Sequence, residues 1–164
     1  MLRNTKEKFA AYHEAGHCIG HLVTGIIFES VDILPEYNCD GKCVTRGKVT
    51  QAKIQQNFSK YDLLIVLYAG FISEAKYRNY PLFLCEILTS ANSSPEYKYA
   101  NEILDNCIAI GYLSSKGKLR GDIKQKTRNY VNLHWNLIEA IANALLERKK
   151  LMYQDVLKIV QSLS

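Results

Sequence analysis

The most constraining feature of the sequence is a His-Glu-x-x-His pattern close to the N-terminus. His13 and His17 are four residues apart, and Glu14 directly follows the first histidine. On a helix, residues four apart lie on one face with about 5–6 Å between their Cβ atoms. Both imidazoles can therefore bind one zinc ion, while Glu14 borders the same face and reaches a zinc-bound water without being a ligand. The pattern predicts a zinc site in which Glu14 activates this water.

The residues around the motif are typical of a helix that packs on one side. Small residues, Ala15 and Gly16, fill the two variable positions and leave room around the site. Apolar residues recur at helical spacing on another face. They are Ala11, Ala15, Cys18, Ile19, Leu22 and Ile26. One face of the helix is thus free for polar chemistry while another packs into a core.

The helix that carries the motif should run from Asn4 or Thr5, as its N-cap, to Gly25 as its C-terminal stop. His21 continues the histidine stripe one turn beyond His17. A straight helix carries it about 6 Å further along the axis, away from an ion at the motif. We therefore expect His21 to line the cleft or to stand partly exposed beside it, and not to bind the metal.

The composition indicates a single domain that spans residues 1–164. With 48% hydrophobic and 23% charged residues, the chain has enough apolar material for a core. The net charge of +5 comes without a long Lys/Arg block, so we expect no nucleic-acid partner. No apolar run approaches the ~20 residues of a membrane span, and the N-terminus lacks the apolar core of a signal peptide. The five scattered cysteines fit reduced thiols and a cytoplasmic location.

Two short strands are expected after the first helix. Residues 28–34 look like a strand that Pro35 ends, and residues 43–50 form a second strand beyond the turn-rich stretch 36–42. Together they suggest a small β-hairpin or sheet edge beside the motif helix. Such an edge can hold an extended peptide by strand addition.

The rest of the chain is expected to be mainly helical. The first of these segments, 63–75, is strongly apolar and should be buried nearly all round. Further helices are expected over 95–111, 122–147 and 154–163. The sequence thus predicts an α+β fold that is mainly α, a helical domain with a small β-hairpin or sheet edge beside the His-Glu-x-x-His helix.

Two carboxylates can complete the metal site. Glu74 lies near the end of the apolar helix. Three roles are open to it: a third zinc ligand, a hydrogen-bond acceptor for the imidazole of a histidine that binds zinc, or a solvated or salt-bridged residue at the helix end. Glu96 follows Pro95 in the first turn of a helix and is the natural candidate for the third ligand. It can equally be an acid that complements the helix dipole. Sequence spacing does not separate these alternatives.

The motifs resemble those of a known family of zinc peptidases. Residues 11–17, Ala-Tyr-His-Glu-Ala-Gly-His, resemble the active-site helix of the FtsH-type (M41) peptidases, which carries H-E-A-G-H. Residues 31–35 look like the strand that follows it, and residues 67–75 are similar to the family's L-x-G-G-R-A-A-E-E helix. Residues 93–100 occupy the place of its S-N-D-L-x-x-A segment. The aspartate of that segment is the family's third zinc ligand, a role that the resemblance carries over to Glu96.

The sequence departs from the family pattern in two of these segments. Glu96 replaces an aspartate and is one methylene longer, so either the backbone shifts to accommodate it or the third ligand comes from elsewhere. The family's Gly-Gly-Arg becomes Ala69-Gly70-Phe71, which loses a basic residue. The sequence also contains no Gly-x4-Gly-Lys-Ser/Thr phosphate loop. We therefore expect a stand-alone peptidase domain, without the ATPase module and the membrane anchor of the family.

The motif and the resemblance together imply a zinc-dependent metalloendopeptidase that hydrolyses peptide bonds of flexible or unfolded polypeptides. Its partners would be a peptide or unfolded protein and, for unfolding, a separate ATPase. The family's proteases act as hexamers, so an oligomer is a further expectation, although much of that ring is built with the ATPase. The alternative is a catalytically weak pseudo-peptidase that serves as a peptide- or protein-binding module. The glutamate at position 96 and the lost arginine favour this alternative.

Overall fold

The structure is a computed structural model of the chain and describes most of its residues. The described ranges are 2–37, 43–45, 47–52, 58–81, 95–109 and 116–163. Within them lie six helices and five short strands, which confirms the predicted α+β, mainly α-helical fold class. The turn expected over 36–42 is wrong at its start, because Glu36 and Tyr37 belong to a short strand that begins at Pro35, and residues 38–42 lie outside the described residues.

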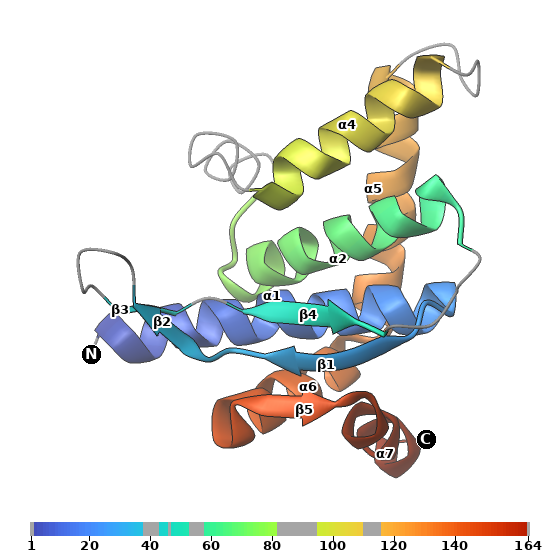
Figure 1. Cartoon of the computed structure of the whole chain (residues 1–164). Coiled ribbons are helices and arrows are strands. Elements are labelled where there is room, and N and C mark those ends of the chain that lie inside the picture. Colours follow the sequence, from blue (N-terminus) through green and yellow to red (C-terminus); the bar gives the residue numbers. More distant parts are fainter. Residues whose placement is uncertain are drawn as a thin grey trace.

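The helices and strands follow one another along the chain as coloured in Figure 1. The helices are α1 (Leu2–Thr24), α2 (Lys60–Tyr77), α4 (Pro95–Ala109), α5 (Lys116–Leu133), α6 (Trp135–Arg148) and α7 (Tyr153–Leu163). The strands are β1 (Phe28–Asp32), β2 (Pro35–Tyr37), β3 (Cys43–Thr45), β4 (Lys48–Gln51) and β5 (Lys150–Met152). Figure 1 shows α1 between α2 on one side and α6 with β5 on the other.

Helices α1 and α2 form the central pair, and they run antiparallel (Figure 1). Two glycines of α1 let them approach closely. A Cβ on Gly16 would lie 2.4 Å from the carbonyl oxygen of Ala69, and one on Gly20 would lie 2.7 Å from the Cα of Val66. Because even a methyl group at these positions would push the helices apart, the spacing of the pair depends on glycine.

Helix α1 carries its motif and its packing face as predicted, but it begins at Leu2, before the predicted N-cap at Asn4 or Thr5. Gly25 follows its last residue with a φ of +72°, a conformation that glycine adopts without strain. Most of the predicted packing face is buried, and Leu22 is partly buried against the same core. The buried members are Ala11, Ala15, Cys18, Ile19 and Ile26. The polar stripe that holds the histidines therefore faces α2 while the apolar stripe joins the core.

Helix α2 is the strongly apolar helix expected over residues 63–75. Its start is fixed by a capping box, in which the Ser59 hydroxyl accepts from the Asp62 N–H and the Asp62 carboxylate accepts from the Ser59 N–H. Every residue from Leu63 to Ala75 is buried except Glu74, which confirms the predicted burial. A charged side chain in such a helix must find partners for its charge, and those of Glu74 lie in the site described below.

The sheet is antiparallel with the strand order β4-β1-β5. Val31 at its centre pairs with Val49 on one side and with Leu151 on the other. The single strand predicted over 43–50 is divided into β3 and β4, and β3 pairs with β2 in a separate two-stranded ladder. Strand β5 was not predicted, because a three-residue strand between two helices carries almost no periodic signal.

The long helix predicted over 122–147 is wrong in two respects. It begins earlier, at Lys116, and it is interrupted at His134, where α5 ends and α6 begins. The φ and ψ of His134 are −106° and 24°, outside helical geometry, although its N–H still donates to the Tyr130 carbonyl. No glycine or proline marks the break in the sequence. No helix among the described residues is long and apolar enough to cross a membrane.

Candidate metal centre

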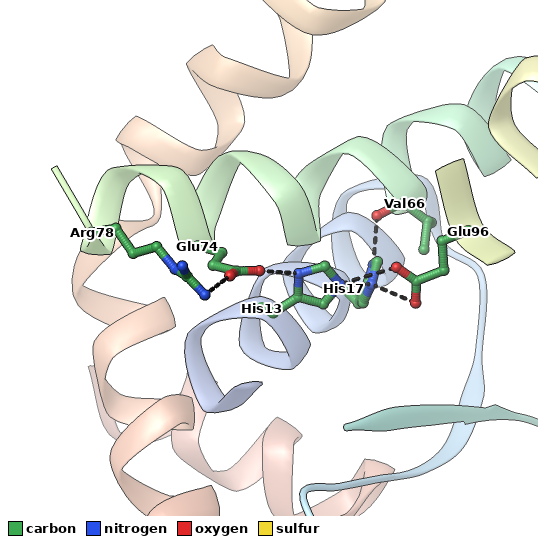
Figure 2. A network of polar contacts seen from close by, with 6 residues as sticks. All are labelled: His13, His17, Val66, Glu74, Arg78 and Glu96. Carbon is green, nitrogen blue, oxygen red and sulfur yellow. Dashed lines mark hydrogen bonds and ion pairs between the residues drawn. The ribbon is translucent and has the colours of Figure 1, made fainter. Parts of the chain in front are cut away.

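Three helices contribute side chains to one cluster, shown in Figure 2. Helix α1 supplies His13 and His17, which contact α2, and Glu14, which lies against Gly47. Helix α2 supplies Glu74, and the first turn of α4 supplies Glu96. The structure therefore brings together all of the ligands and carboxylates that the sequence singles out around the motif.

The candidate ligand atoms of the two histidines and Glu96 lie close to one another. The Nε2 atoms of His13 and His17 are 3.0 Å apart. Glu96 Oε2 lies 3.1 Å from His13 Nε2, and Glu96 Oε1 lies 3.5 Å from His17 Nε2. Ligand atoms about 2.0–2.1 Å from a tetrahedral zinc are separated from one another by about 3.3 Å. The observed spacing of the three donors thus fits a zinc ion.

In each imidazole, the hydrogen-bond partner of Nδ1 determines which of the two nitrogens carries the proton and which has a free lone pair. His17 Nδ1 lies 2.9 Å from the Val66 carbonyl oxygen, which can only accept, so Nδ1 carries the proton. His13 Nδ1 lies 2.9 Å from Glu74 Oε2 and donates to that carboxylate in the same way. In the neutral rings both Nε2 atoms are then unprotonated and face each other, together with a carboxylate. A cation between these atoms would be stabilised by their lone pairs.

The electrostatics of the cluster favour positive charge. Burial lowers the pKa of His13, but its hydrogen bonds to Glu74 and Glu96 outweigh burial and raise the pKa well above its ordinary value. The pKa of His17 is raised in the same way, chiefly by the Glu96 charge acting against burial. Burial raises the pKa of Glu96, but the two imidazoles lower it far below its ordinary range. Glu96 is therefore a carboxylate, and the site attracts a proton or a metal cation.

Glu14 lies beside the donors in a different environment. It is only 3% exposed, and its carboxylate lies within 4.8 Å of the donor nitrogens of His13 and His17. Its Oε2 atom has no hydrogen-bond partner among the described residues. Burial raises the pKa of Glu14 to about 6, although the two imidazoles oppose this. A buried carboxylate of this basicity is suited to accept a proton near neutral pH.

Two glycines make the room that this cluster needs. A Cβ on Gly70 of α2 would lie 2.6 Å from His17 Nε2 and 3.0 Å from His13 Nε2. A Cβ on Gly47, just before β4, would lie 2.1 Å from Glu14 Cγ. The backbone of α2 therefore lies directly against the imidazoles, and the backbone before β4 lies directly against the carboxylate.

His21 is buried at the end of α1 and does not lie beside the donor atoms of His13, His17 and Glu96. The sequence led us to expect it in the cleft or partly exposed, whereas it is 3% exposed in the structure. Its Nδ1–H donates to the Ile26 carbonyl at 2.9 Å, and its ring lies edge-on to Phe28. Burial lowers its pKa to about 4, so the ring is neutral. It fastens the end of α1 to the connection that leads into β1.

Four residues of the site were not identified from the sequence. Arg78 pairs with Glu74, and its spacing of four residues on one helix is a signal that sequence reasoning could have used. Val66 acts through its backbone carbonyl, which no side-chain pattern reveals. Gly70 and Gly47 contribute empty space, and their roles depend on residues distant in the sequence.

Comparison with known proteins adds no relative to this description. The chain matches no family model, and no curated protein matches it. The likeness to FtsH-type peptidases therefore stays a prediction from the motifs, and the functional argument depends on the geometry of the cluster.

Proposed function

We propose that this protein is a zinc-dependent metalloendopeptidase that cleaves flexible or unfolded polypeptides. His13, His17 and Glu96 would hold the metal, and Glu14 would be the general base. The observation that supports this most strongly is the convergence of three donors at zinc-ligand spacing beside a buried carboxylate of raised pKa. Helices α1, α2 and α4 fix these groups from different directions, which suits a preorganised site.

The chemistry divides between the metal and this chain's own residues. Bound zinc supplies a Lewis acid that polarises the scissile carbonyl and acidifies water. Glu14 accepts a proton from the water whose oxygen bonds to the carbonyl carbon. When the C–N bond breaks, Glu14 returns that proton to the leaving amine, so that water is added across the peptide bond.

The surroundings of the site support an extended polypeptide as substrate. The side chains of His13 and His17 are 12% and 6% exposed, whereas that of Glu96 is 39% exposed, so the cluster is most accessible beside α4. A peptide bond within a folded domain could not reach so buried a cluster, but a flexible segment could. Strand β4 has an outer place in the sheet order and begins next to Gly47, which suits strand addition by such a segment.

The proposed function also implies a partner protein and a cellular location. A folded substrate would need a separate unfolding ATPase, because nothing in the described cluster performs that work. The free thiols of Cys18 and Cys107, both buried, suit a reducing compartment such as the cytoplasm.

The decisive experiment measures metal content and cleavage of a fluorescently labelled, unfolded casein in parallel. We expect about one zinc per chain in the wild type. Glu14→Gln should retain the zinc and lose about 10²–10⁴-fold in turnover, the range for a positioned general acid/base. Glu29→Gln, on an exposed position of β1, is the matched control and should cleave normally. A Glu14→Gln variant as active as the wild type contradicts the proposal.

A second candidate function is a peptide-binding module without efficient cleavage. The burial of Glu14 and His17, at 3% and 4% exposure, favours it because a substrate has little access to either group. In this case the wild type would bind zinc and hold the labelled casein without cleaving it. The same two measurements, together with the binding of the labelled casein, therefore separate the candidates.

A further inference from the structure

Arg78 lies at the end of α2, outside the group of donors, and is linked to it through one carboxylate. Its Nη2 atom forms an ion pair with Glu74 Oε1, and Glu74 Oε2 accepts from His13 Nδ1. Figure 2 shows the three side chains in a row, with Glu74 between the other two. The two oxygens of one carboxylate are thus divided between a guanidinium and an imidazole of the metal site.

The placement of Arg78 is fixed by the antiparallel packing of α1 and α2. Phe9 and His13 are one turn apart on α1, and Arg78 and Glu74 are one turn apart on α2. The guanidinium carbon of Arg78 lies 3.7 Å from the centre of the Phe9 ring, one turn before the contact between Glu74 and His13. The two helices therefore meet in two successive contacts, one cation–π and one hydrogen-bonded.

We propose that Arg78 is a positioning residue of the metal centre, which holds the Glu74 carboxylate against His13 and so fixes the direction of the His13 Nε2 lone pair. This inference rests on the proposed metal site. A glutamate side chain has three rotatable bonds, so a hydrogen bond to one oxygen alone restrains it weakly. The ion pair at the other oxygen removes much of that freedom.

The burial of the pair makes this restraint effective. The side chains of Arg78 and Glu74 are 23% and 18% exposed, so their interaction is less screened than that of a surface pair. One oxygen of Glu74 contacts Arg78 and the other contacts His13, so both oxygens of the carboxylate have a partner in this half-buried place.

The contacts of Arg78 require arginine specifically. Its planar guanidinium lies on the Phe9 ring while one of its edges faces the carboxylate. A lysine would keep the charge but lose the guanidinium that lies on the Phe9 ring, while Arg78 contacts Glu74 through Nη2 alone.

The test measures zinc affinity of the purified chain by competition with a chromophoric chelator, and the visible spectrum of the Co²⁺-substituted protein. We expect Arg78→Met to weaken zinc binding by about 10–100-fold, the cost of removing groups that orient a ligand, and to change the Co²⁺ bands. Arg78→Lys should restore only part of the affinity. Lys76→Met is the matched control, because Lys76 lies in the same turn and also contacts an aromatic ring, Trp135, but not Glu74.

A double-mutant comparison separates positioning from general destabilisation. If Arg78 acts through Glu74, then Arg78→Met should cause little further loss of zinc affinity in a Glu74→Gln background. An equal loss in both backgrounds, or wild-type affinity and an unchanged Co²⁺ spectrum in Arg78→Met, would overturn the inference while leaving the metal site intact. A wild-type chain that binds no zinc would overturn the proposed function and this inference with it.

Discussion

Gly70 of α2 lies directly against the imidazole of His17, and a Cβ at this position would come within 2.6 Å of both Cε1 and Nε2 of that ring. The ring cannot move away freely, because its Nδ1–H is bonded to the Val66 carbonyl on the same helix. The helix backbone therefore forms one wall of the donor cluster. The absence of a side chain at position 70 is as much a part of the site as the histidines are.

Gly70→Ala should consequently weaken zinc binding. In an open helix the exchange of glycine for alanine stabilises by about 1 kcal/mol. Here the methyl group must displace His17, and we expect zinc affinity to fall by about tenfold or more. Chelator competition measures this. Gly121→Ala is the matched control, since a Cβ there meets nothing within 4 Å, and it should raise the unfolding temperature without affecting zinc.

Glu96 should contribute more to zinc affinity than Glu74 does. Glu96 faces the Nε2 atoms of both histidines, whereas Glu74 contacts only the far nitrogen of His13. We expect Glu96→Ala to weaken binding by about 100-fold or more, because a ligand is lost, and Glu74→Ala by about 10–100-fold. Zinc titration of both variants tests this order, with Glu102→Ala on the exposed side of α4 as control. The reverse order would place the third ligand at Glu74.

The order of helices and the motif face could be predicted because their signals are local. Apolar residues recur along α1 at helical spacing, α2 is a nearly continuous apolar run, and the His-Glu-x-x-His pattern places its own side chains on one face. The break at His134 could not be predicted, because it lies between two helical stretches without glycine or proline. Lys149 ends α6 with a φ of 65°, where the sequence offers no glycine as a signal.

The parts of the site that were not predicted depend on pairing between distant segments. His13 and Glu74 are 61 residues apart in the sequence, and their contact exists only because α1 and α2 pack in one particular register. The sequence left Glu74 open among three roles, and that register places its carboxylate beside His13 Nδ1 rather than Nε2. Arg78 follows from the same register, because its partner Phe9 lies one turn before His13 on α1.

Acid should destabilise the protein through His21 in a defined pH range. The ordinary pKa of a histidine is 6.5, and burial lowers that of His21 to about 4. Between these values the unfolded chain binds a proton that the folded chain excludes, so stability falls as the pH drops from 6.5 to 4. The loss attributable to this group is on the order of 3 kcal/mol.

His21→Asn isolates this contribution. An asparagine amide can occupy the place of Nδ1–H and donate to the Ile26 carbonyl, but it does not titrate. Urea unfolding from pH 7 to pH 4 should therefore show a shallower loss of stability in the variant than in the wild type. Equal slopes in His21→Asn and the wild type would refute a buried, neutral His21.

Gly47→Ala should separate catalysis from metal binding. A Cβ at this position would lie 2.1 Å from Glu14 Cγ and 2.4 Å from Glu14 Oε1, whereas no histidine atom is among its nearest neighbours. The methyl group must therefore displace Glu14 or the backbone before β4, while the three donors keep their positions. We expect zinc content to stay near one per chain and casein cleavage to fall by about 10²-fold or more, since a general base must lie within hydrogen-bond reach of the proton it accepts. Loss of zinc together with activity would show instead that the segment before β4 supports the whole donor cluster.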